Sequence, residues 1–324
     1  MNVDMEIRTD LTKFAQKTGK IRQRIADIIV GQTNAVDMII TCVIADGHVL
    51  IEGVPGVAKT LLARLVARLI DARFSRIQFT PDLMPSDVLG TSVLNMKNQE
   101  FEFHAGPAFA DIVLADEINR APAKTQAALF EVMEERQATV DGTTYKMGDV
   151  YTIIATQNPV EQEGTYRLPE AQLDRFLMKI TMGYPSEDEE VEILKRHINH
   201  ASFALLDDVQ PVMTKDELRE LRGMMDNVVV DPSLLRYIAQ IVTQSRESKA
   251  VYMGCSPRAS VAMLNCAKAY ALLNGRDFVT PDDIKTVAPF IMQHRLQLTA
   301  ETEMEGYAPM DIAQKLINMV EVPK

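Results

Sequence analysis

The segment from His48 to Ile70 constrains the fold more than any other part of the chain. It reads HVLIEGVPGVAKTLLARLVARLI, which predicts a short apolar strand, a loop containing glycine and proline, and then a helix with an apolar face. A loop between a strand and a helix points backbone N–H groups and the helix N-terminus toward one position, where a phosphate group binds favourably. The segment therefore predicts a phosphate-binding loop at the end of a strand.

Two side chains at the end of this loop fit the same chemistry. Lys59 supplies a positive charge for the β- and γ-phosphates of a nucleotide, and Thr60 offers a hydroxyl to Mg²⁺. The loop departs from the common GxxxxGK[ST] pattern at Ala58, where a second glycine is usual. Because this position begins the helix, where alanine is well tolerated, we expect phosphate binding to be retained. A Gly-Pro turn followed by a solvated lysine is the alternative, and the strand–loop–helix order favours the phosphate site.

The first two thirds of the chain alternate β-rich runs with helical patterns, which indicates βαβ units and a parallel sheet covered by helices. With 324 residues and 47% apolar content, the chain can bury a large core. Asp141-Gly142 lies between β-prone residues and predicts a hairpin just before the fourth strand. The sequence predicts strands at His48 to Glu52, Arg76 to Thr80, Asp111 to Ala115, Tyr151 to Thr156 and Phe176 to Thr181.

We place a domain boundary near Gly183, which divides the chain into residues 1–183 and 184–324. Ser186 and Glu189 form a capping box that predicts a helix directly after the boundary. Asp231-Pro232 and Thr280-Pro281 predict two later helix starts, and strand signals nearly vanish in this part of the chain. The second domain is therefore expected to be helical.

Composition narrows the class of protein. The three cysteines form no CxxC pair, which fits a reducing compartment. The N-terminal sequence MNVDMEIRTD has no apolar core, and no later apolar run approaches the roughly 18 residues of a membrane helix. We therefore expect a cytoplasmic protein without membrane insertion. The net charge of −11 argues against a broad contact with nucleic acid and favours protein partners.

A second candidate site follows the third expected strand. The apolar run Ile112–Ala115 leads to Asp116 and Glu117 at the carboxyl end of the strand, the edge where ligands bind in open α/β sheets. Asp116 would hold magnesium through its waters, and Glu117 would orient and polarise an attacking water. An ordinary solvated strand end is the alternative, and the phosphate-binding loop makes the carboxylate site the stronger interpretation.

Three further residues are candidates for contacts with the γ-phosphate. Asn158 ends the fourth expected strand, where its amide would hold the attacking water, unless Asn158-Pro159 is only a turn. Arg175 in LDRF and Arg258 in CSPRA are the remaining positive charges in suitable places. An arginine there stabilises charge in the transition state by roughly 10³-fold or more. Considered singly, each arginine is more often a partner in a surface salt bridge.

The stretches GVPGVAKT, LADE, ATQNP, LPEAQLDRF and SPRA, in this order and spacing, resemble an AAA+ ATPase of the MoxR family. The resemblance covers nearly the whole chain, and FTPDLMPSDVLG at Phe79 to Gly90 is closer to this family than to AAA+ proteins in general. Ala58 is usual in the family's loop. The resemblance implies an α/β AAA+ core whose parallel five-stranded sheet has the order 5-1-4-3-2, a C-terminal all-helical lid domain, and a ring, usually a hexamer, with ATP between subunits.

The resemblance also implies roles for single residues around ATP and Mg²⁺. Lys59 and Thr60 match Walker A, and Asp116 and Glu117 match Walker B, so that Thr60 and Asp116 would hold the metal. Catalysis is expected from Glu117, from Asn158 as sensor 1, and from Arg175 as an arginine finger acting on the neighbour's ATP. The residues expected to contact the nucleotide are Val30, Gly31, Gln32, Pro55, Gly56, Val57, Ala58, Lys59, Thr60, Leu61 and, as sensor 2 in the lid, Arg258.

The same resemblance implies how such a protein acts. Pro81 to Phe103 matches an insertion shared with magnesium chelatase and certain helicases, and with the Asp141-Gly142 hairpin it would face the ring's pore or upper surface. ATP binding would close the lid on the core, and the changed angle between subunits would move these loops against a protein client. Family members are chaperone-like ATPases that work with von Willebrand factor A domain partners in maturation or metal-cofactor insertion. Arg120 is a weaker candidate for a second residue acting across the interface.

Two alternatives stay open at this point. A DNA-remodelling AAA+ motor would carry the same insertions, although the acidic charge and the stretch PDLMPSDVLG weigh against it. A nucleotide-gated scaffold with negligible turnover would bind ATP and recruit partners. The presence of Glu117, Asn158 and Arg175 favours hydrolysis over a scaffold.

Overall fold

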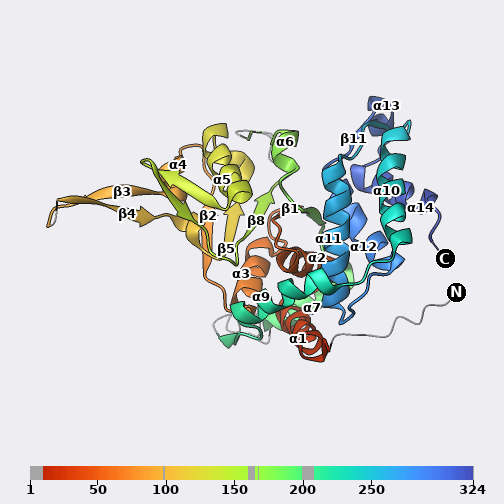
Figure 1. The fold of residues 1–324 in the computed structure, drawn as a ribbon, viewed down its shortest axis with the longest axis horizontal. Coiled ribbons are helices and arrows are strands. Elements are labelled where there is room, and N and C mark those ends of the chain that lie inside the picture. The colour runs from red at the N-terminus through yellow and green to blue at the C-terminus, as the bar shows by residue number, and fades with distance from the viewer. Residues whose placement is uncertain (1–9, 98, 160–164, 167, 199–207, 324) are drawn as a thin grey trace.

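A computed structural model describes residues 10–97, 99–159, 165–166, 168–198 and 208–323 (Figure 1). Five strands form its central sheet: Val49–Gly53 (β1), Phe74–Gln78 (β2), Ile112–Asp116 (β5), Thr152–Gln157 (β8) and Met178–Met182 (β9). They pair in the order β2-β5-β8-β1-β9, and every pairing is parallel. Counted along the chain from the β9 edge, this is the predicted order 5-1-4-3-2, so the α/β fold is confirmed.

Successive residues of the central strands enter two different apolar clusters, as the period of two along a strand requires. On β5, Ile112 and Leu114 belong to one cluster, whereas Val113 and Ala115 belong to the other. Because both faces are covered there, β5 is a continuous apolar run from Ile112 to Ala115 in the sequence. The covering helices are α1 (Thr12–Ile28), α2 (Thr33–Ile44) and α3 (Lys59–Leu69) on the first face, and α4 (Pro85–Leu89) and α5 (Ala123–Glu135) on the second.

The C-terminal part is helical, as predicted. The capping boxes at Ser186 and Thr280 and the Asp231 cap are formed, and each precedes a helix. The sequence did not predict the short antiparallel ribbon of β10 (Val251–Met253) and β11 (Gln297–Leu298). The helices are α7 (Glu187–Ile198), α9 (Lys215–Gly223), α10 (Pro232–Glu247), α11 (Pro257–Leu273), α12 (Pro281–Met292), α13 (Ala300–Met304) and α14 (Pro309–Met319).

The apolar cluster on the first face of the sheet continues into these C-terminal helices without interruption. Ile39 of α2, Met178 of β9 and Ala267 of α11 all belong to it. Helix α9 also packs back toward α1, where Lys17 forms an ion pair with Glu217 at 2.5 Å. The division at residues 183 and 184 stays a prediction, and these contacts show that the two parts share one core.

Two hairpins extend from the side of the sheet that α4 and α5 cover. The Asp141-Gly142 hairpin is confirmed between β6 (Gln137–Val140) and β7 (Thr143–Lys146), with φ of 50° and 81° in the turn, the left-handed values of a type I′ turn. The longer hairpin of β3 (Gly90–Asn95) and β4 (Glu100–Ala105) lies in the predicted insertion and projects far from the sheet (Figure 1). Phe103 stacks on Tyr145 with ring centroids 4.0 Å apart, so the two hairpins touch.

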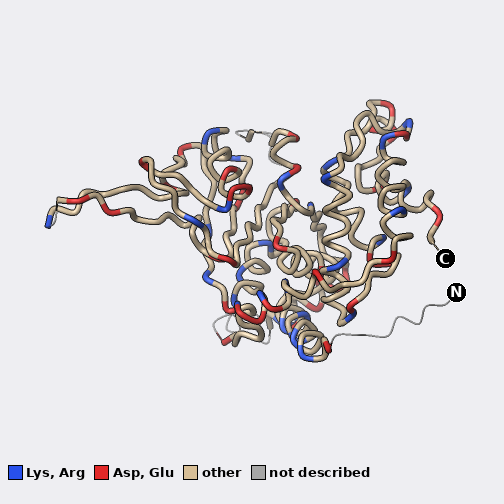
Figure 2. The backbone as a smooth tube through the Cα atoms, in the orientation of Figure 1, with Lys and Arg blue, Asp and Glu red and all other residues tan. Residues whose placement is uncertain are grey.

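Charge and hydropathy along the described chain add two observations. Acidic and basic residues are interspersed along the backbone (Figure 2), with 45 acidic against 34 basic residues in the sequence. Among the described residues, no helix combines the length and the apolar character that crossing a membrane requires. Residues 1–9, from which the absence of a leader was predicted, lie outside the described part of the chain.

The buried His48 ring makes stability depend on pH. Its Nδ1 accepts from the Ile153 N–H at 3.0 Å, so the ring is neutral, and burial lowers the pKa of His48 to about 3. The unfolded chain takes up this proton near pH 6.5, so we expect the free energy of unfolding to fall as pH drops from about 6.5 toward 3, by at most about 1.4 kcal/mol per pH unit from this group. Urea unfolding at several pH values measures this slope.

The matched variant is His48→Asn, which keeps an acceptor near the Ile153 N–H and does not titrate in this range. It should be less stable than the wild type at pH 7.5 and should show a shallower slope between pH 6.5 and 4. Equal slopes in the two proteins would contradict the role of His48.

Candidate functional site

The loop after β1 has the geometry of a phosphate cradle. β1 ends at Gly53, and α3 begins at Lys59, so the first N–H groups of α3 point out at the carboxyl edge of the sheet. Gly56 has φ of +89°, and Ala58 has φ of +63°. The helix propensity of alanine does not explain Ala58, so that prediction was wrong, because the residue is left-handed and lies before the first turn of α3. A left-handed alanine costs about 1 kcal/mol, a strain that glycine would relieve.

The Lys59 ammonium group lies over this loop. Its Nζ donates to the carbonyl oxygen of Gly53 and, at 3.4 Å, to that of Val54. Burial lowers the pKa of Lys59, although the nearby carboxylates of Asp116 and Glu117 favour the charged form. The lysine is thus held at the loop by neutral carbonyl groups, which a phosphate group would outcompete as an acceptor.

Asp116 lies at the end of β5 and faces the start of α3. Its Oδ2 is 3.4 Å from Thr60 Oγ1, and its Oδ1 accepts from Thr156 Oγ1 at 2.6 Å. The same Thr156 oxygen accepts from the Glu117 N–H at 2.9 Å. Thr60 and Asp116 offer the oxygen ligands that Mg²⁺ prefers, beside a helix N-terminus suited to phosphate, so the residues present fit a magnesium–nucleotide complex.

Both carboxylates at the end of β5 are paired with arginines. Arg76 on β2 donates to Asp116 Oδ2 through Nε at 3.0 Å and Nη2 at 2.7 Å, the same oxygen that faces Thr60. Gln78 Nε2 donates to Glu117 Oε2 at 2.8 Å, and Arg120 donates to the same oxygen at 3.0 Å. The pairing of Arg120 is within its own chain, and its action across an interface stays a prediction.

A cavity of about 270 Å³ lies beside the phosphate loop. Six of the predicted nucleotide contacts line it together, namely Val30, Gln32, Gly56, Val57, Ala58 and Leu61. Helix α7 closes the other side with Ile193 and His197. Gly31 has φ of +70°, a left-handed value that favours glycine, and it lies next to the Glu189 carboxylate. Pro55 is exposed in the same loop. The cavity therefore joins the predicted adenine segment to the phosphate loop.

The remaining candidates divide between the two edges of the sheet. Asn158 directly follows β8 and is buried, on the same edge as Asp116. Arg175 and Arg258 lie elsewhere, near the C-terminal end of α5, where Glu134 Oε2 is 2.5 Å from Arg175 and Glu134 Oε1 is 3.7 Å from Arg258. This end of α5 is at the amino edge of the sheet, because Arg136 donates to the carbonyl groups of Asp46 and Tyr151, which precede β1 and β8.

The two arginines are thus separated from their own phosphate loop by the length of the strands, about 17 Å. Arg258, predicted as a nucleotide contact in the lid, lies beside Arg175 and not beside Lys59, since both arginines pair with Glu134. Asp174 Oδ2 also accepts a hydrogen bond from Arg258 Nη1 at 3.4 Å. The roles of Arg175 and Arg258 stay predictions, and the structure shows that they share one surface.

Sequence reasoning missed three residues at the carboxylate pair, namely Arg76, Gln78 and Thr156. A signal was present, because the order 5-1-4-3-2 places the second and fourth strands on either side of the third. Polar residues near the ends of those two strands therefore had to approach Asp116. Arg76 and Gln78 are two apart on β2, so they share a face.

Comparisons with known proteins agree with this geometry. A family model described as the ATPase family associated with various cellular activities (AAA) matches residues 48–178, and an AAA lid domain model matches residues 243–316. The chain is 47% identical over 305 residues to the uncharacterized protein YeaC of Bacillus subtilis, with 94% of each protein covered. It is 41% identical to Chaperone MoxR1 of Mycobacterium tuberculosis, covering 92% of this chain and 80% of that protein. A crystal structure from Cytophaga hutchinsonii superposes with a TM-score of 0.88 at 40% identity, over 97% of both chains.

Arg76 and a metal ion would compete for one oxygen of Asp116. We therefore expect Arg76→Met to lower the Mg²⁺ concentration that gives half-maximal binding of a fluorescent ADP analogue, by about fivefold, since a half-exposed ion pair contributes modestly. Fluorescence titrations at a series of Mg²⁺ concentrations measure this midpoint. Arg73→Met, which removes a similar pair with Asp111, serves as the control and should leave the midpoint unchanged. A higher Mg²⁺ requirement in Arg76→Met would show that Arg76 supports the metal site.

Proposed function

This chain belongs to the MoxR family of AAA+ ATPases, and we propose that it hydrolyses Mg-ATP in a ring oligomer, with each nucleotide between two subunits. The observation that carries the proposal is the convergence of Lys59, Thr60 and Asp116 at the carboxyl edge of the sheet. Family membership supports nucleotide binding in general.

We assign nucleotide binding to the loop and the cavity beside it. The N–H groups at the start of α3 and the Lys59 ammonium bind the phosphates, while Val30 and Gln32 line the cavity for the base. Thr60 and Asp116 would hold Mg²⁺, which neutralises charge that develops on the transferred phosphoryl group. Arg76 must leave Asp116 Oδ2 for this, since it takes the oxygen that faces Thr60.

We assign activation of water to Glu117, with Asn158 orienting the same water. The Glu117 carboxylate is paired with Gln78 and Arg120 here, and its backbone has φ of +55°, an unfavourable value for a non-glycine residue. A general base must reach the proton that it abstracts. Hydrolysis therefore requires Glu117 to exchange these partners for water, so the arrangement described here is a resting one.

We assign Arg175 and Arg258 to the nucleotide of a neighbouring subunit. Both guanidinium groups lie at the amino edge of the sheet, about 17 Å from their own loop, and both are partly exposed. A second copy would therefore have to present its phosphates to this surface. Such an arrangement couples hydrolysis to assembly, which supports a ring, and the family resemblance suggests a hexamer.

We propose that the ring acts on a protein client in the cytoplasm as a chaperone-like remodelling or cofactor-insertion factor. The projecting β3–β4 hairpin exposes Met96 and Phe101, apolar side chains suited to transient contact with another protein. Two relatives are named Chaperone MoxR1 and Protein MoxR. A von Willebrand factor A domain partner rests on the family resemblance alone, and it would be a separate chain.

Turnover should depend on Glu117 and on assembly. We expect Glu117→Gln to lower kcat by about 10²-fold or more while ATP affinity is retained, because the loss falls on activation of water. Steady-state hydrolysis across protein concentration, with oligomer mass recorded on the same samples, measures both effects. Glu131→Gln, an exposed carboxylate on α5, is the control. Tight ATP binding without turnover in the wild type at every concentration would favour the scaffold alternative, and stimulation by DNA would favour the motor.

Mixing experiments separate action within a subunit from action between subunits. Lys59→Ala should not bind nucleotide, and Arg175→Ala and Arg258→Ala should bind it without turnover. We expect activity to return when either arginine variant is mixed with Lys59→Ala, because the Lys59→Ala subunit brings intact arginines to the neighbour's nucleotide. A mixture of Glu117→Gln with Lys59→Ala should stay inactive, since both defects fall on a subunit's own site. Arginine mixtures that stay inactive would exclude action in trans.

A further inference from the structure

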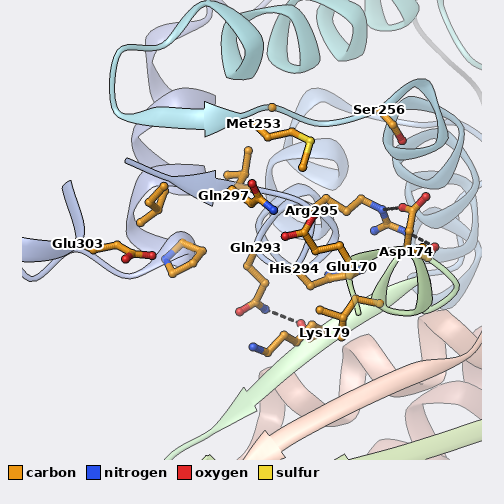
Figure 3. Close-up of a pocket in the computed structure, with 16 residues that line it drawn as sticks. Glu170, Asp174, Lys179, Met253, Ser256, Gln293, His294, Arg295, Gln297 and Glu303 are labelled. Atoms are coloured by element: carbon orange, nitrogen blue, oxygen red, sulfur yellow. Dashed lines mark hydrogen bonds and ion pairs between the residues drawn. The ribbon is translucent and has the colours of Figure 1, made fainter. Parts of the chain in front are cut away.

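Three consecutive residues directly after α12 have buried polar side chains. These residues are Gln293, His294 and Arg295, called here the QHR segment; Gln293 and His294 are 6% and 9% exposed as whole residues, and the Arg295 side chain is 5% exposed. His294 and Arg295 contact the chain between α6 (Glu170–Leu173) and β9, which contains Arg175, and Gln293 contacts β9 itself (Figure 3). Burial of three polar side chains costs free energy unless each finds a partner, so their contacts identify what they hold.

Arg295 contacts the backbone and side chain on both sides of Arg175. Its Nε donates to Asp174 Oδ1 at 2.6 Å, and its Nη2 donates to the carbonyl oxygens of Asp174 at 3.2 Å and Phe176 at 2.8 Å. Its Nη1 donates to Leu177 O at 3.3 Å and to Ile291 O, in the last turn of α12, at 2.7 Å. The rigid fork of one guanidinium group thus fixes residues 174, 176 and 177 together.

The other two residues extend the same contact toward β9. His294 Nε2 donates to Phe176 O at 3.0 Å, and burial keeps the pKa of His294 well below its usual value, so the ring stays neutral. Gln293 Nε2 donates to Lys179 O at 2.5 Å, as Figure 3 shows. The QHR segment therefore binds a continuous stretch of chain from Asp174 to Lys179.

Apolar packing does little to hold Asp174 on one side. An open cleft of about 600 Å³ lies between α6 and the β10–β11 ribbon, and Asp174, Lys179, Met253 and Arg295 line it (Figure 3). Because the cleft replaces packed side chains there, the polar contacts with Arg295 set the position of Asp174, whereas Phe176, two residues further on, is also held by packing against Phe130. Arg258, from the same C-terminal part, adds a second contact to Asp174 at 3.4 Å.

We propose that Arg295 is a positioning residue for Arg175: it fixes the chain on both sides of the finger to the C-terminal helices, so that the finger and these helices move as one body. The proposal rests on the proposed action of Arg175 on a neighbouring subunit. It means that a shift of the C-terminal helices in one subunit moves its finger at the nucleotide of the next. Displacement of a reacting group by about 1 Å changes the reaction rate by about 10²-fold, so a small shift of Arg175 would strongly change the rate of hydrolysis.

The test uses Arg295→Lys, which keeps the charge and loses the fork. We expect kcat to fall by at least about tenfold, with the affinity for ADP unchanged, because the phosphate loop lies at the opposite edge of the sheet. Asp174→Asn removes the partner charge with little change of shape, and it should show the same loss. Mixing either variant with Lys59→Ala should restore activity, since the Lys59→Ala subunit supplies a well-placed finger.

Arg276→Lys is the matched control. Arg276 forms a bidentate pair with Asp283 at 2.7 and 2.5 Å in the same C-terminal part, and among the described residues its hydrogen bonds go to Asp283 and Phe278 and not to residues 174–179. This variant should lose thermal stability and keep the wild-type kcat per assembled ring. The proposal is wrong if Arg295→Lys turns over at the wild-type rate, or if its lost activity is not restored by Lys59→Ala. If Arg175→Ala itself is not restored in that mixture, the action in trans fails, which is a separate result.

Discussion

Hydrogen bonding of β5 between β2 and β8 is the interaction on which the candidate site depends. It places Asp116 between Arg76 on one neighbouring strand and Thr156 on the other, and so decides which groups surround the carboxylates. Parallel pairing then brings the loop after β1 to the same edge. Helices cover both faces of the sheet. Polar groups at the ends of several strands can therefore contact a ligand and water at this edge.

The opposite edge of the sheet carries a second set of charges. Helix α5 connects the two edges, since it begins after the carboxylate pair and ends about 20 Å away at Glu135, next to Glu134. Glu134 neutralises Arg175 and Arg258 there, as Arg76 and Arg120 neutralise Asp116 and Glu117 at the other edge. The chain thus holds both halves of the proposed site with internal counter-ions, and assembly into the proposed ring would exchange these for phosphate and metal.

The C-terminal helices belong to the same cluster of buried side chains as the first face of the sheet. This continuity argues against a lid that swings freely on a linker, which the closing motion inferred from the family resemblance would need. Movement of these helices would have to carry β9 along, because the QHR segment and the shared core join them. In the proposed ring, rotation of whole subunits against one another, with few changes inside each, would fit these contacts better.

The sequence alone determined the features that depend on a few neighbouring residues: the strand–loop–helix at Lys59, the Asp141-Gly142 hairpin and the caps at Ser186 and Thr280. Backbone conformation and local hydrogen bonds act over such short distances, so the pattern was sufficient. Tertiary structure decided the pairing of Arg76 with Asp116, the place of Arg258 beside Arg175, and the contact of Arg295 with Asp174, partners 40 to 121 residues apart. Such contacts follow from how strands and helices stack, and no local pattern encodes which distant carboxylate a buried arginine will meet.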